Sequence, residues 1–184
     1  MALFYLVRHG EPDYGSVFGL GFFGFGLNLA PLTERGIKQV EASAMDERLL
    51  DAEVIISSPY TRALQSAAII AEKIHKKIII EPELHEWMVD KTNKLGSTID
   101  MARLIKEFRE CKGIHPDGEE KRWEEITDMQ DRVRRVADKY AHLKKVIIVA
   151  HGMVCNVLAP ADGMDFADII ECEYKEGQEL RDFF

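Results

Sequence analysis

ALFYLVRHGE, residues 2–11, is the stretch that decides the fold of this chain. Its apolar part, Ala2–Val7, predicts a strand that is buried on both faces, because no charged residue interrupts it. Arg8, His9 and Gly10 follow where that strand ends. Open α/β sheets bind ligands beyond the carboxyl ends of their strands. An arginine with a planar fork of donors, near a glycine that permits close backbone approach, suits a bound anion.

The rest of the chain alternates short apolar runs with longer amphipathic ones. Further strands are predicted at Val54–Ser57, Lys77–Ile80, Lys145–Ala150 and, as a short final strand, Ile169–Tyr174. Helices are predicted at Thr33–Leu50, Thr61–His75, Thr98–Cys111 and Glu119–Leu143. This alternation indicates an α/β protein, a three-layer α/β/α sandwich around a mainly parallel sheet. The last two helices have no strand between them, so we expect a helical insertion packed beside the sheet.

Length and composition favour a single domain over residues 1–184. The chain has 184 residues, of which 46% are hydrophobic and 30% charged, as in an ordinary globular enzyme. Its formal net charge of −8 argues against nucleic acid or an anionic membrane as the main partner. A bound anion therefore has to be held by a local cluster of positive charge.

The sequence carries no targeting signal that we recognise. No stretch is apolar for long enough to span a bilayer, and the first residues lack the apolar core of a signal peptide. Cys111, Cys155 and Cys172 are odd in number and lack metal-ligand spacing, which argues against a disulfide framework. We expect a cytoplasmic protein.

Two further predicted strands also end in polar residues. Val54–Ser57 is followed by Ser58 and by a helix that carries Arg62 in its first turn. Helix N-termini favour anions, and an arginine there adds a full positive charge. Lys145–Ala150 is followed by His151, a second histidine placed before a glycine. We expect both His-Gly pairs to face one crevice, where Ser58 either contacts the ligand or forms part of a turn.

Six segments occur in an order that is typical of one protein family. They are LVRHGE (6–11), PLTERGIKQ (31–39), SSPYTRALQSA (57–67), ELHEW (83–87), DGE (117–119) and VIIVAHG (146–152). On these segments the chain resembles the histidine phosphatase superfamily, which includes the cofactor-dependent phosphoglycerate mutases. The resemblance implies that His9 is the nucleophile that accepts a phosphoryl group. It also implies a phosphate clamp of Arg8, Arg62 and His151, with Glu86 as the proton donor.

The chemistry of phosphoryl transfer agrees with these implied roles. A neutral imidazole can attack phosphorus and form a covalent intermediate that water later resolves. Arg8, Arg62 and a protonated His151 would stabilise the charge on the transferring oxygens. We expect this scheme to need neither a metal nor a cofactor.

Without a metal, the leaving alkoxide has to take its proton from the protein. A carboxylic acid can supply that proton if its pKa is raised toward neutrality. Trp87 beside Glu86 would desolvate the carboxyl and so raise its pKa. Glu83 and Asp90 are the alternative donors, and Glu86 is preferred because it matches the family motif.

The sequence departs from the family pattern soon after Glu11. Pro12, Asp13 and Tyr14, together with residues 17–29 (VFGLGFFGFGLNL), replace a polar, asparagine-containing run that often contacts phosphate or substrate in this family. Glycine weakens helices and strands alike, so this stretch predicts neither. Its phenylalanines either fold back into the core, form an apolar lid over the site, or meet a partner subunit in a homodimer. If they line the entrance, Phe22 and Phe23 join Glu11 and Trp87 as candidate substrate-pocket residues.

These observations favour a phosphatase with an apolar mouth. It would hydrolyse a small phosphorylated metabolite through a phosphohistidine, and an aromatic or partly apolar leaving group would suit its entrance. A phosphoglycerate mutase-like transferase is the alternative, although the interval between Glu86 and His151 is short for one. A non-catalytic member that binds a phosphorylated ligand would have no need of a proton donor. A metal-dependent hydrolase with His9 and His151 as ligands is less favoured still.

Overall fold

A five-stranded sheet forms the centre of the computed structural model, which describes residues 1–118, 120–161, 163–182 and 184. Its strands are β1 (Ala2–Arg8), β2 (Val54–Ser57), β3 (Ile78–Ile80), β4 (Lys145–Ala150) and β5 (Ile169–Tyr174). Their spatial order is β3-β2-β4-β1-β5, and only the pairing of β5 with β1 is antiparallel among the described strands. The predicted strands and the mainly parallel sheet are confirmed.

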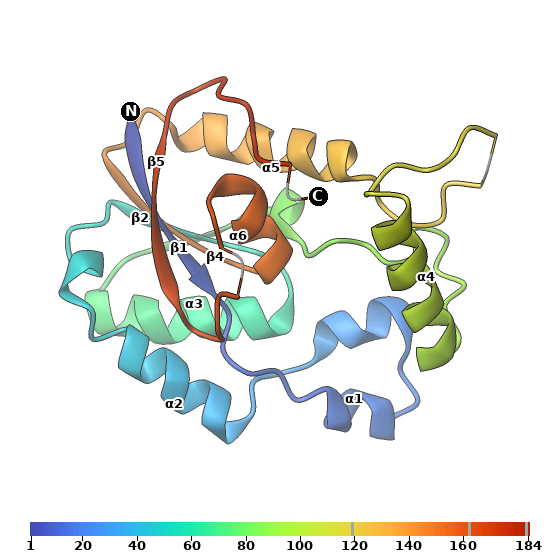
Figure 1. Ribbon diagram of the computed structural model, residues 1–184. Coiled ribbons are helices and arrows are strands. Elements are labelled where there is room, and N and C mark those ends of the chain that lie inside the picture. The colour runs from blue at the N-terminus through green and yellow to red at the C-terminus, as the bar shows by residue number, and fades with distance from the viewer. Residues whose placement is uncertain (119, 162, 183) are drawn as a thin grey trace.

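Helices cover both faces of this sheet (Figure 1). The side chains of β1 alternate between the faces, as expected for a buried strand. Phe4 and Leu6 pack with α5 (Ile126–Tyr140) and α6 (Gly152–Leu158). On the other face, Tyr5 and Val7 pack with α2 (Glu34–Ser43) and α3 (Thr61–Ile74). The three-layer α/β/α sandwich is confirmed.

The predicted helical insertion is only partly correct. α4 (Thr98–Glu110) does lie to one side of the sheet (Figure 1), where Leu104 and Phe108 form a separate small core with Trp123. In contrast, α5 covers the sheet itself and begins at Ile126. The predicted start of that helix, Glu119, lies outside the described residues. Between Glu120 and Glu125 the chain is not helical, because Trp123 is drawn into the small core.

The glycine- and phenylalanine-rich stretch is helical, which corrects the expectation that it forms neither helix nor strand. It contains α1 (Tyr14–Gly19) and the 3₁₀ helix η1 (Gly24–Leu29). The Asp13 carboxylate accepts a hydrogen bond from the Ser16 N–H at 3.1 Å and so caps α1. A bridge between Pro12 and Leu32 closes the segment at its base. Local capping and this closure offset the low helix propensity of glycine.

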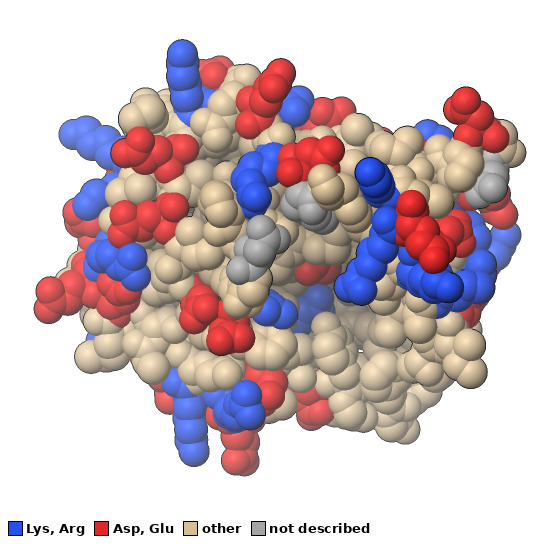
Figure 2. All heavy atoms as spheres, viewed as in Figure 1, with Lys and Arg blue, Asp and Glu red and all other residues tan. Residues whose placement is uncertain are grey.

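The phenylalanines of this segment do not fold back into the core. Phe22 and Phe23 are 41% and 39% exposed, and Phe25 is 66% exposed. Residues 14–29 contain no charged side chain, and Figure 2 shows a largely uncharged surface over α1 and η1, at the lower right of the view. The segment is therefore an apolar surface element beside the sheet.

The remaining helical elements are short. The predicted helix Thr33–Leu50 is interrupted: α2 ends at Ser43, and the 3₁₀ helix η2 covers Glu47–Leu49. A third 3₁₀ helix, η3 (Pro82–Leu84), follows β3 and leads to Glu86. Among the described residues, no helix has both the length and the apolar character needed to cross a membrane.

Candidate active site

The register of three parallel strands brings the two predicted histidines together. β1 and β4 pair Arg8 with Ala150, so His9 and His151 leave the sheet side by side. The His9 N–H donates to the Ala150 carbonyl at 3.0 Å, which continues the strand pairing. The two imidazole rings lie 5.1 Å apart between centroids, in an edge-on arrangement. Ser58 leaves β2 on the other side of β4, and its N–H donates to the Val149 carbonyl at 3.0 Å.

Gly10 allows the backbone after β1 to pack closely against α2. A Cβ at Gly10 would lie 2.5 Å from the Gly36 carbonyl oxygen, and a Cβ at Gly36 would lie 2.3 Å from the Glu11 carbonyl oxygen. The two glycines therefore let α2 approach the end of β1. This contact gives a packing reason for the glycine of the His-Gly pair, where the sequence had suggested close approach to an anion.

His9 is held as a neutral imidazole with a free basic nitrogen. Its side chain is 4% exposed, and its Nδ1 lies 2.7 Å from the Gly10 carbonyl oxygen. A carbonyl can only accept, so Nδ1 carries the proton. Nε2 accepts a hydrogen bond from Arg62 Nε at 3.1 Å. Burial, with Arg62 nearby, lowers the His9 pKa to about 3, so the lone pair on Nε2 is available throughout the neutral range.

His151 lies deeper than His9 and is also neutral. Its side chain is fully buried, and its Nε2 lies 2.7 Å from the Ser58 hydroxyl. Burial, followed by the charge of Arg62, lowers the pKa of His151 well below its usual value. The protonated His151 expected from the sequence is therefore not the form that the unliganded site favours. A bound dianion would raise the pKa of His151 and so favour its protonated form.

Two arginines surround the histidines. Arg62 is 4% exposed and lies in the first turn of α3, as predicted. Arg8 donates from Nη1 to the Met164 carbonyl, and its guanidinium lies over the Phe166 ring at 4.3 Å. In the described part of the chain, three buried nitrogens of this cluster have no hydrogen-bond partner: Arg8 Nε, Arg62 Nη1 and His151 Nδ1. Buried polar groups are normally paired, so these nitrogens mark a place for a ligand with several acceptor oxygens.

Glu86 lies beside this cluster, on the loop after η3. Its carboxylate accepts a hydrogen bond from the Trp87 N–H at 2.9 Å. Burial raises the pKa of Glu86, against the opposing effects of that hydrogen bond and of Arg62. The desolvation expected from the sequence is therefore present, and it keeps a proton on the carboxyl to higher pH than an exposed glutamate would hold one.

A buried ion pair between α5 and the segment before it supports the loop that carries Glu86. The sequence analysis did not predict this pair. Arg132 on α5 pairs with Glu124, with Nε to Oε1 at 2.6 Å and Nη2 to Oε2 at 2.9 Å. Arg132 Nη1 also donates to the His85 carbonyl at 2.8 Å. Glu124 accepts from the Met88 N–H at 3.1 Å, and its carbonyl accepts from the Trp87 indole at 2.7 Å. The pair thus fixes the backbone on both sides of Glu86.

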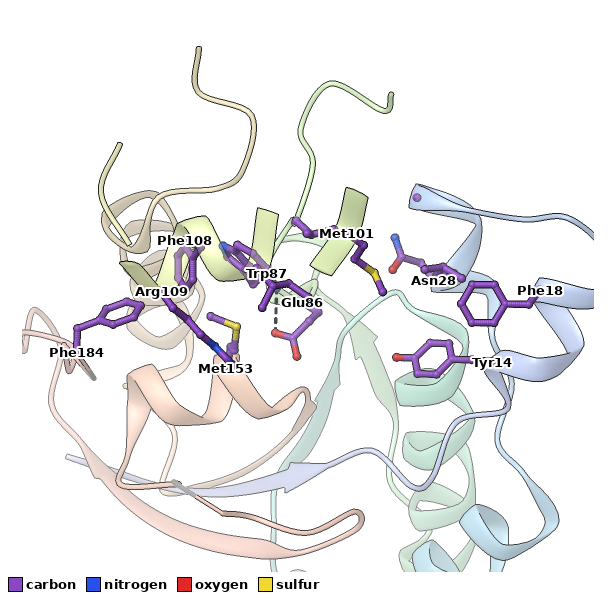
Figure 3. Close-up of a pocket in the computed structure, with 14 residues that line it drawn as sticks. Tyr14, Phe18, Asn28, Glu86, Trp87, Met101, Phe108, Arg109, Met153 and Phe184 are labelled. Carbon is purple, nitrogen blue, oxygen red and sulfur yellow. Dashed lines mark hydrogen bonds between the residues drawn. The ribbon is translucent and has the colours of Figure 1, made fainter. Parts of the chain in front are cut away.

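An apolar cavity of about 690 Å³ opens next to Glu86 (Figure 3). Its walls come from α1, η1, the Glu86 loop, α4 and α6. The residues that line it are Tyr14, Phe18, Gly24, Leu27, Asn28, Glu86, Trp87, Val89, Met101, Ile105, Phe108, Arg109, Met153 and Phe184. Tyr14 lies over Arg62 at 5.8 Å between ring and guanidinium carbon, so the cavity adjoins the histidine and arginine cluster.

The four predicted pocket residues do not all line this cavity. Trp87 does, and its ring packs on Phe108 at 4.3 Å between centroids. Phe22 and Phe23 are not among the lining residues, because Phe18 from the same segment takes that place. Glu11 is also not among them, and its carboxylate accepts a hydrogen bond from the Thr33 hydroxyl at 2.8 Å.

Fold and site together define an α/β protein with a buried cluster of two histidines and two arginines at the ends of parallel strands. Residues 4–176 match the sequence profile of the histidine phosphatase superfamily (branch 1). The chain belongs to this superfamily.

Its relatives include proteins named as phosphatases and as mutases. An uncharacterized phosphatase, PhoE of Bacillus subtilis, is 30% identical over 154 residues, which are 83% of this chain and 73% of that protein. A probable phosphoglycerate mutase, GpmB of Photorhabdus laumondii, is 27% identical and aligns over 84% of this chain and 71% of its own length.

Solved structures confirm the fold. YhfR of Bacillus stearothermophilus superposes with a TM-score of 0.71 at 21% identity, over 100% of this chain and 96% of that one. The mycobacterial glucosyl-3-phosphoglycerate phosphatase Rv2419c gives a TM-score of 0.67 at 22% identity, over 92% and 89% of the two chains.

Proposed function

We propose that this chain is a phosphomonoester hydrolase that works through a phosphohistidine on His9. The observation that carries the proposal is the buried cluster at the strand ends. There, the lone pair of His9 Nε2 lies beside Arg8 Nε, Arg62 Nη1 and His151 Nδ1, three buried nitrogens without partners in the described structure. A phosphoryl group would give these nitrogens acceptor oxygens and give Nε2 an electrophile.

In the first step, His9 Nε2 attacks phosphorus, and the bond from phosphorus to the leaving oxygen breaks. Arg62 Nε would transfer its hydrogen bond from Nε2 to a phosphoryl oxygen as the ester binds. The leaving oxygen takes the proton of Glu86, whose raised pKa keeps that proton available. The arginines stabilise the charge on the transferring group, so the scheme requires no metal.

In the second step, water attacks the phosphohistidine. The Glu86 carboxylate, now ionised, takes a proton from that water. The bond between nitrogen and phosphorus breaks, its electron pair returns to His9 Nε2, and inorganic phosphate leaves. The enzyme is then back in its starting protonation state.

The adjoining cavity supports an apolar leaving group. Ten of the residues that surround it are aromatic or aliphatic, and the cavity volume of about 690 Å³ suits a small molecule. We therefore favour aromatic or partly apolar phosphate esters over small sugar-acid phosphates. The likeness to proteins named as phosphoglycerate mutases keeps phosphoryl transfer between hydroxyls as the second candidate.

The test is a screen of phosphate esters with detection of free phosphate, in the presence of a metal chelator. We expect phosphate release, higher kcat/KM for aryl phosphates than for phosphoglycerates, and a phosphorylated His9 in rapidly quenched samples. His9→Ala should lower the rate of release by about ten thousandfold or more while the thermal unfolding curve stays cooperative. Release by His9→Ala at the wild-type rate would refute the proposal, and accumulation of an isomeric ester would favour the mutase.

A further inference from the structure

The apolar cavity carries one cation on its wall. Among the described side chains that line it, Glu86 and Arg109 are the only charged ones. Arg109 is the second-to-last residue of α4. Figure 3 shows its side chain extending from α4 toward Met153, with Glu86 beyond. A guanidinium on an otherwise apolar wall suits an anionic group of a ligand, because it keeps its charge at any working pH.

Arg109 differs from the other basic residues of its helix. Arg103 pairs with Asp100 at 2.7 Å and with Glu107 at 3.5 Å, and Lys106 pairs with Glu110 at 3.6 Å. For Arg109, no carboxylate of the described residues lies within ion-pairing distance. The helix therefore pairs Arg103 and Lys106, which do not line the cavity, and leaves Arg109, which does, without a carboxylate partner among the described residues.

Arg109 also lies away from the phosphate end of the cavity. Tyr14 marks that end, because its ring lies over Arg62. In Figure 3, Tyr14 and Phe18 are on one side of Glu86, and Arg109 and Phe184 are on the other. A ligand that reaches both ends has its phosphate at the arginine and histidine cluster, its apolar body against Trp87, and its far end at Arg109.

We propose that Arg109 selects phosphate esters whose apolar leaving group ends in a carboxylate or a similar anion. This inference rests on the proposed phosphatase activity and adds the chemical class of the leaving group. The net charge of −8 gives no general attraction for anions, so a second negative charge on the substrate needs a local partner. Because Arg109 is exposed to solvent, its pairing with that anion is worth a moderate factor in kcat/KM, about fivefold.

A matched pair of substrates tests the inference. One is the phosphate ester of 3-(4-hydroxyphenyl)propanoic acid, and the other is the corresponding propanamide ester. The two-carbon spacer keeps the charge away from the ring oxygen, so both phenols leave with similar ease. We expect wild-type enzyme to prefer the acid by about fivefold in kcat/KM, mainly through KM. Arg109→Leu should abolish this preference and leave turnover of the amide within about twofold of wild type.

Lys106→Leu is the control, because it removes the same charge from the same helix at a residue that does not line the cavity. It should keep the preference for the acid. Equal turnover of acid and amide by wild type would overturn the inference and leave the phosphatase proposal intact. A preference that survives Arg109→Leu, or a loss that is equal for both esters, would also overturn it. If wild type released phosphate from neither ester, the proposed function and this inference would fall together.

Discussion

The buried cluster of histidines and arginines and the cavity beside it are built in different ways. In the cluster, His9 and His151 each follow a strand, and Arg62 lies in the first turn of the long helix α3. Each of these three residues is at most 4% exposed. The cavity walls come from α1, η1 and α4, which lie at the side of the sheet and leave Tyr14 38% exposed. Strand register fixes the first group to within a residue, whereas the second depends on how connecting segments pack. In the proposed phosphatase, the reacting groups are thus attached to the sheet. The residues that would select the leaving group lie on connecting segments, which can change without disturbing the sheet.

Glu86 lies where the two regions meet, and the largest effect is expected there. Glu86→Gln should lower kcat for alkyl phosphates by about a thousandfold, because the leaving alkoxide loses its proton donor. The same variant should keep 4-nitrophenyl phosphate turnover within about tenfold of wild type, since that phenolate leaves without a proton. Steady-state kinetics with the two esters measures the difference, and equal losses for both would contradict a role as acid.

The pH dependence of kcat/KM gives a second test of the role of Glu86. Because burial raises the pKa of Glu86, kcat/KM for alkyl esters should fall as the pH rises through that value, and Glu86→Gln should lack this fall. The His9 pKa of about 3 predicts that protonation of the nucleophile reduces the rate only in strong acid. A fall of kcat/KM near pH 6 on the acid side, attributable to His9, would contradict the neutral imidazole.

The buried pair of Arg132 and Glu124 joins the two regions through the Glu86 loop. Arg132→Met should lower the free energy of unfolding by about 3 kcal/mol, because it leaves the Glu124 carboxylate buried without its partner. Arg135→Met is the matched control on the same helix. Arg135 is 60% exposed and pairs with Glu83 at the surface, so its removal should cost less than about 1 kcal/mol. Chemical denaturation measures both, and similar losses would mean that burial of the pair matters little.

The difference between strand ends and connecting segments also explains which site residues the sequence predicted. Arg8, His9, Arg62 and His151 were predictable as a group, because each follows an apolar run and parallel strands end at one edge of a sheet. Glu124 and Arg132 were not, since an ion pair that supports a loop has no local pattern.

The helices α1 and η1 were missed for a related reason. Glycine lowers helix propensity, and the Asp13 cap and the bridge from Pro12 to Leu32 that offset it depend on contacts rather than on periodicity. For the same reason, the sequence pointed to Phe22 and Phe23 where the cavity is lined by Phe18. On a short helix, the position of the cap determines which side chains face the cavity. A search for long periodic patterns does not detect such a cap.

The buried histidines should make the phosphate end sensitive to acid. In the unfolded chain His9 binds a proton below about pH 6.5, but in the folded protein it does so only near pH 3, so stability falls as the pH drops. Between about pH 7.5 and about pH 5, wild type should lose about 2 kcal/mol of unfolding free energy relative to His9→Gln. Denaturation of both proteins at the two pH values measures this, and a difference that does not change with pH would contradict the low pKa of His9.

The smallest effect is expected at the cavity wall. Phe18→Ala should raise KM for an aryl phosphate by about fivefold and leave KM for a small alkyl phosphate unchanged, because only the aryl group reaches that wall. Phe22→Ala is the control, since Phe22 belongs to the same segment and does not line the cavity. If both variants raise KM equally, the segment acts as a unit that closes over the substrate, and the distinction between its lining and surface phenylalanines is wrong. If neither does, the leaving group lies outside the cavity, and the apolar walls have to be explained by something other than substrate binding.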